Sequence, residues 1–502
     1  MPLPKLKLFI DGEFVDASGG ATYRSLNPAN GEALAEVAWA GAEDAEKAIA
    51  AARVAFDAGP WREMSAVDRR HLLDRLADAL KARSEDFALM EVRDAGALLA
   101  KARTDVALGV SQLREFAKMA ERYDRAPQPI DGLQRKGRSF TYLVREPIGV
   151  CAQIIPWNFP LTMAIWKLGH ALATGNTVVL KCAPETPLSA LELARLCRDV
   201  GFPKGVVNII TGDVEAGSVL ASSPLVDKVS FTGSTEIGRL VMASASKTLK
   251  SVTLECGGKS ANIVLDDADH SLAIDGSLYA TFFHAGQACE SGTRLLLSNA
   301  HSASFTEALV EKARTIKIGD PMDPETTIGP VVSEKQLKRI QHYIEVGQGE
   351  GATLRLGGKR ATSGKLSNGY FIEPTIFTGV ANSMTIAQEE IFGPVLSVLE
   401  YRDIDDAIQI ANDTVYGLAA GVWSKDDRKA MSVAARLRAG WIWINEWHVL
   451  SPSAPFGGFK QSGVGREFGE EGLNAYTEVK TIHQDDARSR AAKGWYNVVV
   501  PA

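Results

Sequence analysis

The chain has 502 residues, 45% of them hydrophobic and 23% charged, which is typical of a globular protein with an ample core. Because single cores rarely grow beyond roughly 250–300 residues, we expect more than one domain. The net charge of −6 argues against a nucleic-acid-binding protein, which usually carries a basic surface. No apolar run approaches the roughly 20 residues of a membrane-spanning helix, which argues against an integral membrane protein.

Five cysteines are present, and no two of them form a C-x-x-C pair. The odd number and the spacing predict neither a disulfide framework nor a structural zinc site, and we expect no metal site. The first residues lack the apolar segment of a secretory signal. These features are typical of a protein of the reducing cytoplasm, where we expect this chain to act.

The N-terminal third has mostly helical patterns. Residues 42–58 and 66–82 are rich in alanine and other helix formers, with apolar residues three and four positions apart. Residues 139–144 instead alternate and are rich in β-formers, as in an exposed strand.

A regular alternation of strands and helices begins at residue 148. The expected elements are strands at 148–155 and 177–180, a helix at 187–200, strands at 206–210 and 229–231, a helix at 234–245 and a strand at 252–254. Further strands are expected near 292–297, 395–399 and 441–444. Strands separated by helices indicate parallel, doubly wound sheets. We therefore expect an α/β fold with two doubly wound α/β domains, packed closely because no low-complexity linker separates them.

The segment Gly286-Gln287-Ala288-Cys289-Glu290-Ser291-Gly292 places one cysteine between glycines. Glycines allow a tight turn that presents the thiol, and small neighbours leave room for a substrate beside the sulfur. A thiolate is a strong nucleophile, although a lone cysteine is more often a small buried hydrophobe. Cys289 is therefore a candidate nucleophile that needs support from other segments.

Two polar residues at the ends of apolar strands could supply that support. Asn158 lies between Pro156 and Pro160, and such rigidity suits a donor that must be in place before an oxyanion develops. A turn in which Asn158 bonds its own backbone is the alternative. Glu255 ends an apolar strand, where partial desolvation would raise its pKa towards that of a useful general base. A capping or lysine-paired glutamate is the alternative there.

Signals for phosphate binding are weak. No G-x-G-x-x-G fingerprint follows an expected strand, and Gly258-Lys259-Ser260 is no P-loop because Thr253 stands where a glycine is required. In residues 231–238, Gly233 allows close backbone approach, and Ser234 or Thr235 can cap a helix whose free amides would face an anion. A plain helix cap is the alternative. The pair Glu389-Glu390 before Phe392 is either a binding feature or a solvated acidic pair.

Taken together, these segments resemble the aldehyde dehydrogenase superfamily. The matching motifs occur in the family's order and spacing, and they are residues 156–161, 231–238, 254–260, 286–294, 389–395 and 455–463. The resemblance extends from about Asp11 to Lys480. This family binds its nucleotide on an α/β domain without the usual glycine fingerprint, which agrees with the absence of that fingerprint here.

The resemblance implies an NAD(P)-dependent enzyme of the hydrolytic type that oxidises an aldehyde to the carboxylic acid. It also implies an NAD-binding domain at residues 1–125 and 148–258 and a catalytic domain at 259–465. Bridging segments at 126–147 and 466–502 would form a small β oligomerisation element.

The resemblance implies a role for each catalytic candidate. Cys289 would attack the aldehyde to give a thiohemiacetal and then a thioester, while Asn158 and the Cys289 N–H hold the oxyanion. Glu255 would activate the water that releases the acid. Lys167 and Glu467 match a pair implicated in relaying that proton.

NAD is the expected cofactor. The implied contacts are Ile154, Pro156, Trp157 and Lys181 for the adenosine half, Gly233 and Ser234 for the pyrophosphate, and Glu390 with Phe392 for the nicotinamide ribose. A ribose diol is well held by an ionised carboxylate. The family often places an acid three residues after this lysine, where it repels a 2′-phosphate. Pro184 occupies that position and Glu185 follows, so use of NADP stays open.

A small-molecule aldehyde is the expected partner, and its class is predicted from a tunnel. Positions that match the family's tunnel are Met163, Trp166, Phe283, Trp447, Leu450 and Phe456. This lining is aromatic and apolar with no arginine to clamp a carboxylate, so we expect apolar or aromatic aldehydes rather than charged semialdehydes. Glu290 and His448 are polar exceptions, which either face the tunnel or face away from it. Cys256, where the family usually has leucine, is interpreted as a small buried side chain.

Alternative functions are a semialdehyde dehydrogenase and a non-catalytic structural protein of the same fold. A CoA-acylating relative should lack Glu255, which argues against that class. The alternating residues 139–144 and the apolar run 495–500 would be costly as bare strand edges. Because relatives associate through such segments, a homodimer or homotetramer is expected.

Overall fold

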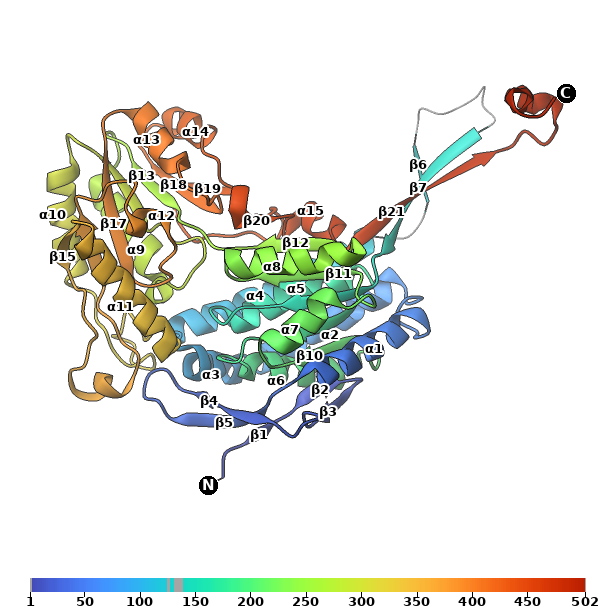
Figure 1. Cartoon of the computed structure of the whole chain (residues 1–502), viewed down its shortest axis with the longest axis horizontal. Coiled ribbons are helices and arrows are strands. Elements are labelled where there is room, and N and C mark those ends of the chain that lie inside the picture. The colour runs from blue at the N-terminus through green and yellow to red at the C-terminus, as the bar shows by residue number, and fades with distance from the viewer. Residues whose placement is uncertain (1, 124–126, 131–138, 502) are drawn as a thin grey trace.

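The computed structural model describes residues 2–123, 127–130 and 139–501. Two large sheets lie side by side, each packed with helices, and a narrow three-stranded arm projects from the molecule (Figure 1). The expected α/β fold with two doubly wound units and a small β element is confirmed. The domain boundaries stay a prediction, and positions 126 and 131–138 of the bridging segment lie outside the described residues.

The first large sheet has a parallel centre with antiparallel strands at both edges. In spatial order its strands are β20 (Gly463–Val464), β12 (Ser251–Glu255), β11 (Lys228–Thr232), β8 (Val150–Ile154), β9 (Thr177–Lys181), β10 (Val207–Ile210), β2 (Leu8–Ile10) and β3 (Glu13–Val15). The central strands are buried throughout, which explains why they are continuous apolar runs in the sequence.

Successive side chains of these strands enter two different cores because the side-chain period of a strand is two. Cys151, Val178 and Leu180 belong to one core, and Val150 and Val179 belong to the other. The first core is covered by α2 (Ala66–Ala82), α3 (Ser84–Ala95), α4 (Leu99–Arg122), α5 (Pro160–Ala173) and α6 (Leu188–Asp199). The second is covered by α1 (Ala42–Asp57), α7 (Val214–Ser222) and α8 (Thr235–Ala245). The expected helices at 42–58 and 66–82 are confirmed.

The second large sheet is parallel except for its first strand. In spatial order its strands are β15 (Thr353–Leu356), β16 (Thr375–Thr378), β17 (Val395–Tyr401), β14 (Arg294–Ser298), β13 (Ala261–Val264), β18 (Ala419–Trp423) and β19 (Trp441–Ile444). Its helices are α9 (His270–Phe282), α10 (Ser302–Ala313), α11 (Glu334–Gly349), α12 (Thr385–Gln388), α13 (Ile404–Asn412) and α14 (Asp427–Ala434). Single turns of 3-10 helix span Ser246–Thr248 (η1), Phe283–Gly286 (η2), Gly364–Asn368 (η3) and Lys460–Ser462 (η4). No helix of the described residues is long and apolar enough to cross a membrane.

The N-terminal strands were not expected from the sequence. β1 (Lys5–Leu6), β5 (Ala33–Ala38) and β4 (Thr22–Leu26) form a separate small sheet beside β2 and β3. These strands are two to six residues long, and β5 is rich in alanine, which is a helix former. Local propensity therefore hides them, and pairing with neighbours decides their conformation.

The arm corrects two expectations about bare strand edges. It consists of β21 (Thr477–Asp485), β7 (Ser139–Pro147) and β6 (Gln128–Ile130), and β21 follows the short helix α15 (Gly469–Asn474). Residues 139–144 belong to β7, which is the central strand and is paired on both sides. The run 495–500 is no strand, because most of it lies in the 3-10 segment η5 (Ala491–Val498). This segment closes on itself, since Arg490 donates to the Val500 carbonyl (2.8 Å).

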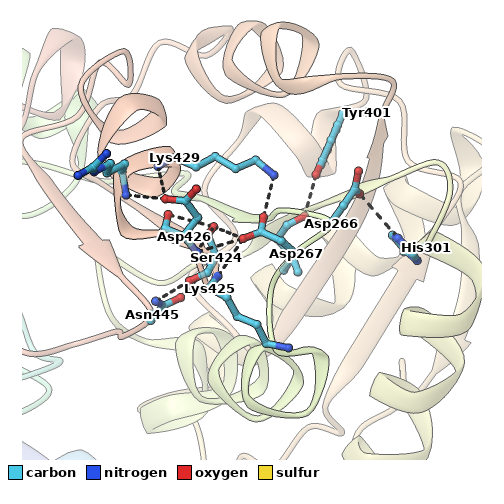
Figure 2. A network of polar contacts seen from close by, with 11 residues as sticks. Asp266, Asp267, His301, Tyr401, Ser424, Lys425, Asp426, Lys429 and Asn445 are labelled. Carbon is cyan, nitrogen blue, oxygen red and sulfur yellow. Dashed lines mark hydrogen bonds and ion pairs between the residues drawn. The ribbon is translucent and has the colours of Figure 1, made fainter.

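A polar network ties together the segments that follow β13, β18 and β19 of the second sheet (Figure 2). Asp267 accepts hydrogen bonds from Ser424 Oγ (2.6 Å), the amides of Lys425 and Asp426 and the Lys429 ammonium (2.7 Å). Asn445 is bonded to both backbone groups of Ser424 at 2.8 and 2.9 Å. The loop after β19 is therefore anchored where it leaves the sheet.

We expect Asp267→Ala to destabilise the second sheet. The substitution removes one carboxylate that satisfies four donors, and a loss of about 1–3 kcal/mol follows from the usual cost of unmade hydrogen bonds. The midpoint of denaturant unfolding measures the effect. Asp266→Ala is the matched control, because Asp266 is exposed and its ion-pair contact within the described part of the chain is a long one, to His301 (4.0 Å). Equal midpoints for the two variants would contradict the prediction.

Candidate active site

A cavity of about 1790 Å³ is lined by residues of both large α/β units. Strands β8, β9, β11 and β12 are parallel, so their carboxyl ends meet at one edge of the sheet. The residues that follow them, among them Asn158 and Gly233, form the cavity wall. This edge is where open α/β sheets usually bind ligands.

Cys289 lies in the turn between η2 and β14, and its side chain lines the cavity. The preceding backbone is left-handed at His284, Ala285 and Gly286. A Cβ at Gly286 would collide with the backbone of Gly393, so only glycine fits there. The Cys289 Sγ donates a hydrogen bond to Glu290 Oε2 (3.2 Å). Burial, together with the charges of Glu255 and Glu290, raises the pKa of the Cys289 thiol well above its ordinary value.

Glu255 is the last residue of β12 and is 2% exposed. Burial raises the pKa of its carboxyl to about 7, although the Cys289 thiol and the Lys167 ammonium lower it. Its Oε1 has no hydrogen-bond partner among the described residues. The carboxyl therefore faces the cavity with a free oxygen and a pKa close to neutral pH.

Asn158 comes from the segment between β8 and α5 and is 4% exposed. Its Nδ2 donates to the Gln287 carbonyl (2.9 Å), two residues before Cys289. This bond links the first unit to the turn that carries the thiol. A primary amide has two hydrogens, so a second donor is left for another acceptor.

Lys167 and Glu467 form a buried ion pair behind the cavity. Lys167 Nζ lies 2.5 Å from Glu467 Oε1 and 2.9 Å from Ser230 Oγ, and His170 Nδ1 lies 3.7 Å from the other carboxylate oxygen. Burial would raise the pKa of Glu467, but the charges of Lys167 and His170 lower it. The structure brings the two residues together, although neither lines the cavity itself.

All the residues expected to bind the cofactor line the cavity. Ser234 caps α8 by accepting from the Ile237 amide (3.4 Å). A Cβ at Gly233 would collide with the Phe231 ring, so glycine permits close approach of a ligand to the backbone. Lys181 Nζ donates to the Gly212 carbonyl (2.7 Å), and burial lowers the pKa of this lysine. These features fit a dinucleotide, which needs backbone donors for its phosphates and a polar cradle for its sugars.

Glu390 also lines the cavity. Burial raises the pKa of its carboxyl to about 7, although the amide of Gly258 donates to it (3.0 Å) and lowers that pKa. Phe392 has a left-handed backbone (φ 60°) and meets the Trp157 ring edge-on at 5.2 Å. Pro184 and Glu185 also line the cavity, near Lys181 in sequence.

Five of the six residues expected to contact the substrate also line the cavity, namely Met163, Trp166, Phe283, Leu450 and Phe456. The expectation for Trp447 is wrong. Its side chain is fully buried with Trp443, away from the cavity wall. It packs where Gly292 and Gly421 leave room, since a Cβ at either glycine would collide with the indole.

One ion pair that lines the cavity was not expected from the sequence. Lys101 and Asp105 lie one turn apart on α4, both line the cavity, and Lys101 Nζ is 2.5 Å from Asp105 Oδ2. The Lys101 ammonium also lies 4.1 Å from the centre of the Phe159 ring. None of the matched tunnel positions is an arginine, but this lysine reaches the cavity wall from α4, outside those positions. Two opposite charges four residues apart on the apolar face of a helix were the available signal.

Glu290 and His448, whose orientation the sequence left open, both face the cavity. His448 Nδ1 lies 2.9 Å from Glu290 Oε1. Burial would raise the pKa of Glu290, but the hydrogen bond and charge of His448 outweigh it and lower that pKa. The thiol of Cys289 is thus flanked by two carboxyl groups in different electrostatic states.

Comparisons with known proteins agree with this site. The model of the aldehyde dehydrogenase family matches residues 14–482. A mitochondrial aldehyde dehydrogenase of Mesocricetus auratus is 47% identical over 480 residues, which cover 95% of this chain and 94% of the relative. The betaine aldehyde dehydrogenase of Bacillus subtilis is 43% identical over 493 residues, covering 98% and 99%. The crystal structure of betaine aldehyde dehydrogenase from Staphylococcus aureus in complex with NAD+ has a TM-score of 0.94 at 41% identity and covers 96% of each chain.

The chain therefore belongs to the aldehyde dehydrogenase family, as its motifs suggested. It is an NAD-dependent enzyme that oxidises an aldehyde to the carboxylic acid, with Cys289 as the cysteine nucleophile.

Proposed function

We propose that Cys289, Asn158 and Glu255 divide the chemistry of this oxidation among them. The Cys289 sulfur forms a bond to the aldehyde carbon, and the carbonyl electrons move onto oxygen. The second Nδ2 hydrogen of Asn158 and the Cys289 N–H hold the oxyanion. NAD on the cofactor side of the cavity supplies the acceptor for the hydride, and a thioester remains on the sulfur. The observation that carries this assignment is the convergence of a thiol, an amide and a carboxyl with a pKa near 7 on one cavity wall.

Glu255 then serves as the base for hydrolysis. Its unpaired oxygen accepts a proton from water as the water attacks the thioester, and the thiolate of Cys289 leaves with the acid as product. Lys167 and Glu467 would relay that proton away, because Lys167 couples electrostatically to Glu255 and is hydrogen-bonded to Glu467.

The cofactor contacts follow from the same cavity. Ile154, Pro156, Trp157 and Lys181 would hold the adenosine half, and the amides beside Gly233 and Ser234 would face the pyrophosphate. Glu390 would bind the nicotinamide ribose with Phe392 beside it. Glu185 on the wall next to Pro184 favours NAD, because a carboxylate there would repel a 2′-phosphate.

Cys289→Ala should abolish turnover while leaving NAD binding measurable, because the thiol acts covalently and the cofactor lies elsewhere. Glu255→Gln should leave a burst of NADH and then slow the steady state. Since only deprotonated Glu255 is a base, hydrolysis in the wild type should rise with pH through about 7, and the variant should lose that dependence. Absorbance at 340 nm measures the turnover of Cys289→Ala, the burst in Glu255→Gln and the pH dependence of the wild type. More than a few per cent activity in Cys289→Ala would contradict the assignment and favour another nucleophile.

For the substrate, we propose a neutral aldehyde with an apolar or aromatic tail. Trp166, Phe283 and Phe456 offer apolar surface, and each buried CH₂ contributes roughly 0.8 kcal/mol. Lys101 could attract an anion, which would favour the second candidate, a semialdehyde dehydrogenase. Asp105 already neutralises this lysine at 2.5 Å, so a substrate carboxylate would lose hydration without gaining a free cation. A quaternary ammonium, as the name of the betaine aldehyde relatives suggests, would meet the resident ammonium over the Phe159 ring.

Benzaldehyde and hexanal should therefore have a higher kcat/KM than succinic semialdehyde or betaine aldehyde. Asp105→Asn frees Lys101 and should raise kcat/KM for succinic semialdehyde relative to benzaldehyde. Glu115→Gln, a change in an exposed ion pair farther along α4, is the matched control. A wild-type preference for the semialdehyde would show that the pocket has been interpreted wrongly.

We further propose that the chain forms a homodimer or a dimer of dimers through the arm. Ile482 of β21 and Phe140 of β7 lie on one face of the arm, and most of residues 495–500 are exposed apolar side chains as well, which favour burial against another copy.

Light scattering at micromolar concentration should give the mass of a dimer or tetramer. Ile482→Asp should shift the protein to smaller species, because a carboxylate would be buried in the contact. Thr481→Asp serves as control, since neighbouring side chains of a strand point to opposite faces. A monomeric wild type would refute the proposal.

A further inference from the structure

The strongest unassigned feature is a chain of three side chains that begins at the nucleophile. Cys289 Sγ donates to Glu290 Oε2 at 3.2 Å, and His448 Nδ1 lies 2.9 Å from the other oxygen, Oε1. The side chains of His448 and Glu290 are 4% and 9% exposed. One carboxylate therefore links the thiol to an imidazole inside the cavity, and none of the roles proposed above uses that link.

The surroundings hold His448 in place. Its ring packs against Phe283 (4.7 Å) and meets Tyr279 edge-on (5.1 Å). Its backbone is left-handed (φ 62°), as is that of Asn445, which is bonded to Ser424 within the network of Figure 2. A residue other than glycine keeps such a backbone only where the surrounding structure enforces it. The surrounding structure therefore holds His448 in a strained backbone conformation that points its imidazole at Glu290.

The two carboxyl groups beside the thiol differ in charge state. His448 lowers the pKa of Glu290 against the effect of burial, whereas burial raises that of Glu255 to about 7. Other charged groups near this wall include the paired Lys101 and Asp105 on α4 and Glu446, whose charge acts on Tyr279 together with those of Glu290 and Asp105. Glu290 is therefore the carboxylate that stays ionised beside a thiol whose own pKa is well above its ordinary value. A thiol of that kind needs a base when it attacks.

We propose that Glu290 is the general base for Cys289 and that His448 is a positioning residue that keeps Glu290 oriented. As the sulfur bonds to the aldehyde carbon, the S–H proton moves to Glu290 Oε2, and the carbonyl electrons move to oxygen. After hydrolysis the departing thiolate takes the proton back from Glu290, so the carboxylate is restored in each cycle. The inference rests on the proposed role of Cys289 as nucleophile, and it leaves Glu255 for the water.

The thiol and the water lose their protons at different stages of the reaction, so a different base can serve each step. The thiol must lose its proton before any acyl group is present, when Glu255 at a pKa of about 7 is protonated in about half of the molecules at neutral pH. The water must lose its proton afterwards, when the sulfur is acylated and no longer donates to Glu290. Both carboxyl groups reach the thiol, but the pKa of Glu290 is lowered, whereas that of Glu255 is raised and its Oε1 is left unpaired for water.

Glu290→Gln tests the base directly, because the amide keeps the shape but cannot take the proton. We expect the single-turnover rate of NADH formation, with enzyme in excess over benzaldehyde, to fall about a hundredfold. We also expect alkylation of Cys289 by iodoacetamide at pH 7 to slow at least about tenfold, measured by intact mass with Cys289→Ala as blank. The other four cysteines are buried. Glu446→Gln, an exposed glutamate on the loop of His448, is the matched control.

Only a fall in both rates supports the proposal. If Glu290 acted through its charge alone, its removal would lower the pKa of the thiol and speed alkylation, and that result would overturn the inference. Unchanged NADH formation would overturn it as well. Alkylation needs no aldehyde, so it still reports on Glu290 if the substrate class proposed above fails. Failure of Cys289 itself would appear as turnover in Cys289→Ala.

The role of His448 is tested by the pH dependence of the alkylation rate of Cys289. In a Glu255→Gln background, which removes the other titrating carboxyl, alkylation by iodoacetamide should fall at acid pH as Glu290 becomes protonated. His448→Leu should move that fall to higher pH, because loss of the hydrogen bond raises the pKa of Glu290. His448→Asn keeps a donor near the position of Nδ1 and should restore the profile. A profile that does not move in His448→Leu, or that His448→Asn fails to restore, would overturn the role.

Discussion

Burial of ionisable groups in the cavity is the constraint on which the rest of the site depends. A carboxyl or thiol that leaves water loses the hydration of its charged form, so its pKa rises unless a partner compensates. No cation offsets burial at Cys289, and Lys167 offsets it only in part at Glu255, so the pKa values of both groups are raised. Glu290 has His448, and its pKa is lowered. The same environment thus produces two adjacent carboxyl groups with different proton occupancy, and a difference of this kind separates acid and base roles in enzymes.

The fold brings these groups together through the geometry of parallel strands. Glu255 ends β12, and Asn158 follows β8 by four residues, so both lie at the same edge of the first sheet. Cys289 reaches that edge from the other unit, and the bond from Asn158 to the Gln287 carbonyl joins the two. Gly258 completes the junction, because a Cβ there would collide with the Cys289 carbonyl. The relative positions of the three catalytic groups therefore depend on how closely the two units pack, and glycines permit that close packing.

The sequence predicts those parts of the molecule that depend on short stretches of chain. The glycine-flanked turn of Cys289, the strand end at Glu255 and the helix cap at Ser234 are local features, and the structure has each of them. The helix at residues 66–82 is predicted at its observed ends from its helix-forming residues and apolar spacing, and Ser65 caps it in the structure. Short N-terminal strands escaped notice, since they depend on pairing with distant residues and not on propensity.

The sequence does not predict features that depend on the direction in which a side chain points. Trp447 and His448 are adjacent, yet the indole enters the core between Gly292 and Gly421 while the imidazole faces the cavity. The left-handed backbone at His448 and the anchor at Asn445 determine which of the two side chains lines the pocket. Neither of these backbone features has a local sequence signature. Lys101 and Asp105 lie on a helix more than 50 positions before the first motif, and only packing against α5 brings them to the wall. Substrate class is decided by such residues, so the sequence identifies the reaction more securely than the aldehyde.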